Sequence, residues 1–296
     1  MIVIKKKLRL IIFFLIFIII SPIVVLYAKG DIFTNGWNIL ETGGMYVTEA
    51  PVGSNIFLNS KSQTSTSFFS RDILIKNLRP GTYHVLVQKD GYNAWSNTLM
   101  VKNNLVVAAD VFMLPTHVIL EEIPKYISQS DGTATTTGAK IKNQDYVDIL
   151  AVFSTSSPAV SKKIFSTSTI DFKDNLGTKI SPIMDGKIGL WQDGSAIFAK
   201  WFGDDDQAPT YFCNGSDCSE TITVYHSLAP IRKINFLPDY NSVVLVASGD
   251  EIFAIQIENN PDKVPQLIYK GTNPTFQMIG GDVYIKDNTY IAHVQL

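Results

Sequence analysis

This chain of 296 residues contains few cysteines and few histidines, and it has no excess of positive charge. With two cysteines and four histidines, the sequence offers few of the ligands that protein zinc sites use. Once Lys5, Lys6, Lys7 and Arg9 are set aside, 21 basic residues remain against 27 acidic ones, which is a net charge of −6. Nucleic-acid binding needs a basic surface, so this composition argues against a nucleic-acid partner.

The sequence also lacks the common catalytic motifs. It contains no Gly-x-Ser-x-Gly elbow, no phosphate-cradling glycine-rich loop before a helix and no His-Glu-x-x-His. His84, His117, His226 and His293 are far apart in sequence and have no partner at ligand spacing. We therefore expect no enzyme, no cofactor and no catalytic residue. A glycan-acting enzyme on a β scaffold is the alternative, and it would need two carboxylates about 5–10 Å apart in a cleft.

What the chain does have is an almost entirely apolar run over residues 8–28, preceded by the basic cluster. A helix of this length rises about 31 Å, close to the thickness of a bilayer core. The run predicts a single transmembrane helix that contacts the lipid bilayer. The alternative is a cleaved signal peptide, for which Leu26-Tyr27-Ala28 is a poor cleavage site.

The basic cluster of Lys5, Lys6, Lys7 and Arg9 sets the predicted orientation. Positive charge beside a membrane span tends to stay cytoplasmic. We therefore expect a cytoplasmic tail over residues 1–7, a juxtamembrane connector over 29–43, and the remaining domains outside the cell membrane.

Helical periodicity is nearly absent after the apolar run. Apolar and polar residues alternate instead, with turn signals every 8–12 residues, which is typical of all-β proteins. Seven or so short strands predict a small β-sandwich over 44–115, followed by a linker over 116–143. Strands are expected again over 144–296, beginning with Tyr146–Phe153.

Three turn motifs in the first β region stand out. They are Ala50–Asn59, Leu78–Val85 and Lys89–Trp95. This region resembles the PEGA domain family, small β-sandwich modules of bacterial and archaeal envelope proteins. The first motif departs from the family pattern, because Val52 and Ser54 replace the usual Glu and Ala.

The motif residues have structural explanations. A proline presets φ for a turn, and a glycine can take a positive φ. Tyr83 is expected to face the core, and Tyr92 with Trp95 to close one end of the sandwich. An exposed sugar-stacking platform is the alternative for these two rings. The predicted structural motif residues are Pro51, Gly53, Pro80, Gly81, Tyr83, Gly91, Tyr92 and Trp95.

The strands over 144–296 recur with a spacing near 40 residues, which suits β-propeller blades. One segment, Phe236–Val246, weakly resembles the repeats of WD40-like propellers. The length predicts three and a half to four blades. Closure of this array could come from a strand over 118–127, from the sandwich, or from a second copy of the protein.

Two smaller features have alternative explanations. Cys213 and Cys218 flank an Asn-Gly turn and could form a disulfide across a hairpin tip, or remain free thiols. Asp204, Asp205 and Asp206 are weak candidates for calcium ligands, because adjacent carboxylates more often form a solvated turn.

These features together predict a membrane-anchored, extracytoplasmic binding or structural protein of the cell envelope. The PEGA-like module would be a spacer or wall contact, and the blade domain would bind a protein or cell-wall glycan. A self-assembling surface protein, which pairs edge to edge as a homo-oligomer, is a further alternative.

Overall fold

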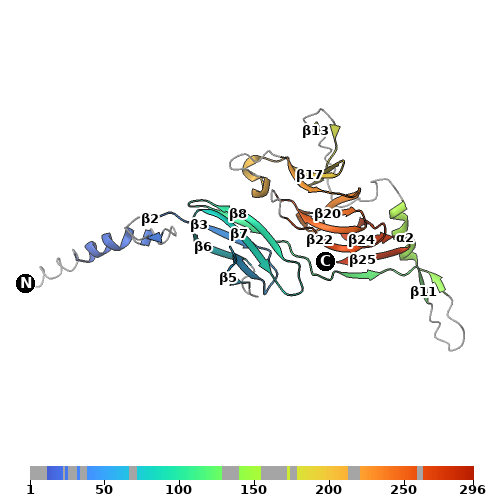
Figure 1. The fold of residues 1–296 in the computed structure, drawn as a ribbon, viewed down its shortest axis with the longest axis horizontal. Coiled ribbons are helices and arrows are strands. Elements are labelled where there is room, and N and C mark those ends of the chain that lie inside the picture. The colour runs from blue at the N-terminus through green and yellow to red at the C-terminus, as the bar shows by residue number, and fades with distance from the viewer. Residues whose placement is uncertain are drawn as a thin grey trace, which may run out of the picture. The chain divides into compact units, whose positions relative to one another are not determined.

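The computed structural model describes residues 12–22, 24–25, 32–33, 39–66, 72–128, 140–154, 172–173, 179–212, 221–258 and 263–296. The chain divides into two compact units. Unit 1 is Met1–Asp90 with Ala94–Val111, and unit 2 is Gly91–Asn93 with Phe112–Leu296. Strands make up most of the regular structure of both units (Figure 1).

Unit 1 contains a three-stranded and a four-stranded sheet. In the first, β3 (Gly43–Thr48) is central and pairs antiparallel with β6 (Ile73–Leu78) and parallel with β9 (Val106–Asp110). The second is antiparallel, in the order β5 (Lys61–Ser65), β4 (Asn55–Leu58), β7 (Gly81–Gln88) and β8 (Trp95–Val101). A short hairpin, β1 (Ile32–Phe33) and β2 (Ile39–Leu40), precedes them.

Each sheet of unit 1 buries one face. Met45 and Val47 on β3 are fully buried, as are Val85 and Val87 on β7. In both pairs the residue between them points to the opposite face, because side chains alternate along a strand. This alternation is compatible with the predicted sandwich.

Unit 2 is built from three four-stranded sheets, and we name them in chain order. The first sheet is β15 (Ile183–Asp185), β16 (Ile188–Asp193), β17 (Ala196–Trp201) and β18 (Ile222–His226). The middle sheet is β19 (Ile231–Leu237), β20 (Tyr240–Ser248), β21 (Glu251–Gln256) and β22 (Gln266–Lys270). The third sheet is β10 (Ile119–Glu122), β25 (Tyr290–Gln295), β24 (Asp282–Asp287) and β23 (Thr275–Ile279).

Smaller elements connect these sheets. Between β10 and the first sheet lie the hairpins β11 (Tyr126–Ser128) with β12 (Lys140–Lys142) and β13 (Phe172–Lys173) with β14 (Lys179–Ile180). Helix α2 (Gln144–Ser154) lies between the two hairpins in sequence. Two 3₁₀ turns, η1 (Asp205–Gln207) and η2 (Thr210–Phe212), follow β17.

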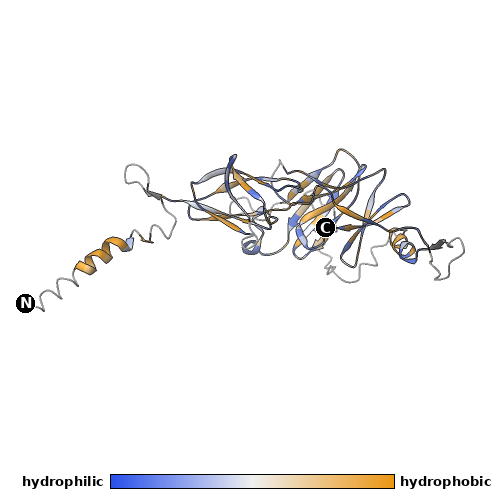
Figure 2. Ribbon diagram, turned by 90° about the horizontal axis from the view of Figure 1, so that it is seen from below, coloured by the Kyte–Doolittle hydropathy of each residue, from blue (hydrophilic) through white to orange (hydrophobic). Residues whose placement is uncertain are grey.

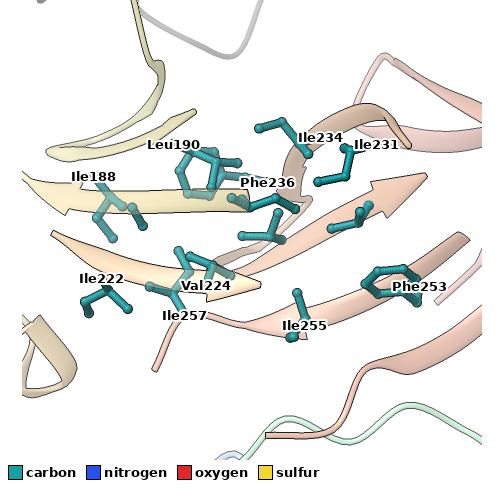
Figure 3. Packing of buried hydrophobic residues seen from close by; sticks show 14 of the residues in the cluster. Ile188, Leu190, Ile222, Val224, Ile231, Ile234, Phe236, Phe253, Ile255 and Ile257 are labelled. Carbon is teal, nitrogen blue, oxygen red and sulfur yellow. The ribbon is translucent and has the colours of Figure 1, made fainter. Parts of the chain in front are cut away.

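The middle sheet is covered on both faces. Val244, Val246 and Phe253 belong to a core shared with the first sheet, part of which is drawn in Figure 3. The intervening Val243 and Leu245 belong to a second core, shared with the third sheet. Because both faces are buried, β20 is apolar without alternation, as expected for a sheet between two layers.

A buried glutamine ties the start of unit 2 to the middle sheet. Gln266 on β22 accepts a hydrogen bond from the Leu114 backbone N–H (2.6 Å) and donates one to the Phe112 carbonyl (2.7 Å). Its side-chain amide thus pairs with the backbone much as another strand would. Phe112 and Leu114 themselves lie in the core shared with the third sheet.

The predicted membrane anchor is not supported. Residues 12–22 and 24–25 are helical, and most of them are apolar (Figure 2). No helix in the described part of the chain is both long and apolar enough to cross a membrane. This finding overturns the predicted transmembrane helix over 8–28 and the single-pass cell-membrane location that rested on it.

The predicted propeller is also wrong. The described residues form separate four-stranded sheets and no closed propeller. Two elements differ from the predicted arrangement. The strand expected over 118–127 contributes β10, which pairs with β25 and completes the third sheet from outside the predicted domain. Tyr146–Phe153, expected to be a strand, lies instead in helix α2.

Helix α2 forms because its apolar residues follow a helical period. Tyr146 is buried, and Ile149, Leu150 and Phe153 are half-buried, a spacing of three and four residues. Asn143 precedes the helix, and its side-chain oxygen accepts a hydrogen bond from the Asp145 N–H (3.1 Å), as an N-cap residue does. Alternation alone did not distinguish this short segment from a strand.

Candidate functional site: an exposed apolar sheet face

The outer face of the three-stranded sheet in unit 1 carries exposed apolar side chains on all three strands. Tyr46 on β3 is paired in register with Leu74 on β6 and Ala108 on β9, and Gly44 is paired with Val106. The exposed fractions are 43% for Leu74, 39% for Tyr46 and 59% for Val106. We call these five residues the open face.

The open face is continuous across β3 because of a glycine. A Cβ atom built at Gly44 would lie 3.4 Å from the Val106 side chain and 3.6 Å from the Leu74 side chain. It would also lie 3.2 Å from the Ile75 carbonyl oxygen, a tight approach to backbone that a larger residue would strain. Gly44 therefore lets the two flanking apolar side chains approach each other over the central strand.

One end of the open face is acidic and held by hydrogen bonds. The Tyr46 hydroxyl donates to Asp72 Oδ2 (3.2 Å), and the Thr48 hydroxyl donates to Asp110 Oδ1 (2.8 Å). The Asp72 carboxylate raises the pKa of Tyr46. Burial, followed by the charges of Asp110 and Asp72, raises the pKa of the neighbouring Glu49. The charges of Asp110 and Asp72 therefore act on Glu49 at this end of the sheet.

This arrangement has the chemistry of a binding surface. Large contiguous apolar patches on the surface of a folded domain mark interaction sites. The acidic end would repel anions and attract a basic group. Within the described ranges, no group of three or more His, Cys, Asp or Glu residues is placed to hold a metal ion.

The residues predicted as structural motifs occupy turns and the core of the sheets. The Pro51 carbonyl accepts hydrogen bonds from the Ser54 N–H and hydroxyl (3.1 and 2.6 Å), and Gly53 has a φ of +86°. In the second motif, which contains Pro80, the Gly81 φ is +151°, and the Tyr83 hydroxyl donates to the Arg79 carbonyl (2.9 Å).

In the third motif, Gly91–Asn93 belong to unit 2 and the residues on either side belong to unit 1. Gly91 has a φ of +78°, and Tyr92 forms a β-bridge with Pro115. Trp95 is only 5% exposed. A sugar-stacking platform needs an exposed ring, so the buried Trp95 cannot form one with Tyr92.

The three consecutive acids lie on an exposed turn. Asp204 begins η1, its carboxylate is 3.8 Å from the Lys187 amine, and its carbonyl accepts a hydrogen bond from the Trp201 indole (3.0 Å). Asp205 and Asp206 form the first turn of η1 and are exposed. The structure brings no other His, Cys, Asp or Glu set to this turn among the residues it describes.

Other predicted sites lie outside the described residues. These are Cys213 and Cys218, for which a disulfide was predicted, and Lys5, Lys6, Lys7 and Arg9, the orientation signal. The disulfide remains a prediction, whereas the orientation depended on the membrane span that the structure does not support.

The structure brings together one histidine cluster that the sequence did not suggest. His293 Nε2 is 3.4 Å from Asp282 Oδ1, and His293 Nδ1 is 3.8 Å from Glu121 Oε2. The ring of Tyr284 is 5.2 Å from the His293 ring, centroid to centroid. Glu121 comes from β10, which is remote in sequence, so ligand spacing could not have found this contact. Both carboxylates are more than half exposed, and the cluster is part of no metal-binding group.

Comparison with known proteins does not assign this chain to a family. No protein-family model matches the sequence, and no curated protein matches it either. The resemblance to the PEGA family and to WD40-like repeats therefore stays a prediction.

Proposed function

We propose that this chain is a non-enzymatic binding protein whose open face docks a protein segment. The observation that supports this is the row of Leu74, Tyr46 and Val106, which are 39–59% exposed across three adjacent strands. Apolar side chains on such a surface gain free energy when a partner removes them from water, at about 25 cal/mol per Å². In unit 2, by contrast, many apolar side chains of the strands lie in two buried cores.

The partner is expected to be amphipathic. Its apolar side chains would cover the open face, and a Lys or Arg beside them would meet Asp72, Asp110 and Glu49. The charge fixes the orientation of the partner more than it adds affinity. A cell-wall glycan fits less well, because the aromatic ring best suited to stacking in this unit, Trp95, is buried.

Selection of short random peptides displayed on phage tests the proposal. The full chain should enrich peptides in which apolar residues flank Lys or Arg. Binding should fall at least about tenfold in the double variant Leu74→Lys/Val106→Lys, because residues central to an interface each contribute more than about 1 kcal/mol.

The matched control is Met100→Lys. Met100 is 61% exposed but lies on β8, in the other sheet of unit 1. This variant should keep peptide binding. Peptides that bind the double variant as well as the native chain would contradict the proposal.

A further inference from the structure

Strand β6 carries an acid, an apolar residue and a base at alternate positions. Asp72 directly precedes the strand, and Leu74 and Lys76 lie within it. Alternate residues of a strand point to the same face, so all three lie on the outer face of the three-stranded sheet, and all three are exposed. The open face therefore has a basic end as well as its acidic end.

The apolar part of the open face lies between these two charges. Its central row is the register Leu74, Tyr46 and Ala108 across the three strands. Each residue of a strand rises about 3.3 Å, so Asp72 and Lys76 are about 13 Å apart, with the central row midway between them.

A surface with this charge pattern is complementary to itself. In a two-fold contact, residue i of one copy meets residue j of the other, and j meets i. A two-fold axis that runs along the central row, at right angles to the strands, turns the face over and reverses the strand direction. It places Asp72 of each copy over Lys76 of the other and sets the two apolar rows against each other.

The Lys76 amine is available for such a contact. No hydrogen bond or ion pair joins it to another residue in the part of the chain that the structure describes. Lys76 stands beside Leu74, and a basic group beside apolar side chains is what the acidic end of Asp72, Asp110 and Glu49 requires of a partner. The chain thus carries both halves of the contact on one face.

We infer that the partner of the open face is a second copy of this chain, packed face to face in a two-fold dimer in which Asp72 of each copy pairs with Lys76 of the other. This inference rests on the proposed function, because it names the occupant of the same surface. Sheets that pack face to face lie about 10 Å apart, close enough for their apolar side chains to meet.

The dimer is expected to be weak. A standard protein interface buries about 800 Å² on each partner, and a face of three short strands offers less than that. We therefore expect a dissociation constant on the order of 100 µM, so that the chain is a monomer at low micromolar concentration and a dimer at high concentration.

Sedimentation equilibrium of the full chain, at concentrations up to about 1 mM, tests the dimer through charge reversal. Asp72→Lys sets two lysines against each other at both contacts, and Lys76→Asp sets two aspartates there. Each variant alone should associate at least about tenfold more weakly than the native chain. An equimolar mixture of the two variants restores opposite charges at both contacts, so it should associate to within about threefold of the native chain.

The matched control is Lys61→Asp, which reverses an exposed lysine on β5 in the other sheet of unit 1 and should associate as the native chain does. Three results would overturn the inference: a native chain that stays monomeric at about 1 mM, single variants that associate as well as the native chain, or a mixture that associates no better than either variant alone. Peptides that still bind the open face of a monomeric chain would leave the proposed function standing and make the partner a different protein. Loss of peptide binding as well would refute both.

Discussion

The middle sheet of unit 2 and the three-stranded sheet of unit 1 use the same residue types to opposite effect. Val243–Ala247 on β20 is a run of apolar residues that are all fully buried, because a core lies on each side of the sheet. Ile73–Ile75 on β6 is also an apolar run, yet Leu74 within it is 43% exposed. An apolar run without alternation places apolar side chains on both faces of the strand. Whether both faces are buried depends on the layers that pack against the sheet.

Replacing one leucine by alanine on each sheet should give the largest difference in unfolding free energy between the two sheets. Leu245→Ala on β20 leaves a cavity in the core shared with the third sheet and should cost about 2–5 kcal/mol of unfolding free energy. Leu74→Ala should change it by less than about 0.5 kcal/mol, because its side chain already contacts water. Denaturant unfolding measures both. Equal losses would show that the open face is part of a core.

A buried carboxylate of unit 2 extends the comparison between the two units, because its ionisation makes the unfolding free energy depend on pH. Asp287 accepts hydrogen bonds from the backbone N–H groups of Thr272 (2.8 Å) and Asn273 (3.0 Å) and from the Tyr269 hydroxyl (3.3 Å). Burial would raise the pKa of Asp287, but these hydrogen bonds outweigh it and hold the pKa below the ordinary value. Glu49, at the open face, has a raised pKa instead.

The two carboxylates should therefore act on stability with opposite signs. A lowered pKa in the folded chain contributes stability above the unfolded value, near 3.9, and this is lost as the pH falls through the folded pKa. Asp287→Asn should cost about 1–3 kcal/mol at pH 7, and the cost should shrink toward pH 2. Asp206→Asn, on the exposed η1 turn, is the control and should leave the unfolding free energy at pH 7 within about 0.5 kcal/mol of the native chain. A cost for Asp287→Asn that is equal at both pH values would contradict the hydrogen-bond account.

Much of the strand content could be read from the sequence. Alternation located β7, where Tyr83, Val85 and Val87 share a face, and the Gly249-Asp250 turn located the end of β20 and the start of β21. The third sheet was harder to predict from the sequence, because β10 and β25 pair across more than 160 intervening residues and no local pattern connects them. Helix α2 was missed because the eight residues Tyr146–Phe153 fit both the period of a helix and the period of a strand.

The candidate site was only partly predictable. The signal was present in Ile73–Ile75, where an apolar residue stands at a position that alternation assigns to the solvent. The sequence could not show that Leu74, Tyr46 and Val106 meet, since the parallel pairing of β3 with β9 brings residues about 60 positions apart into register. The expectation of a membrane anchor failed for a different reason, because no helix among the residues that the structure describes is long and apolar enough to cross a membrane.

The unfolding free energy of Leu74→Lys/Val106→Lys is the most direct test of the open face. Two lysines on a surface that faces water should leave stability within about 0.5 kcal/mol of the native chain. A loss of about 2 kcal/mol or more would mean that the folded chain covers these side chains itself. That result would contradict the proposal that the side chains of the open face are exposed and bind a partner.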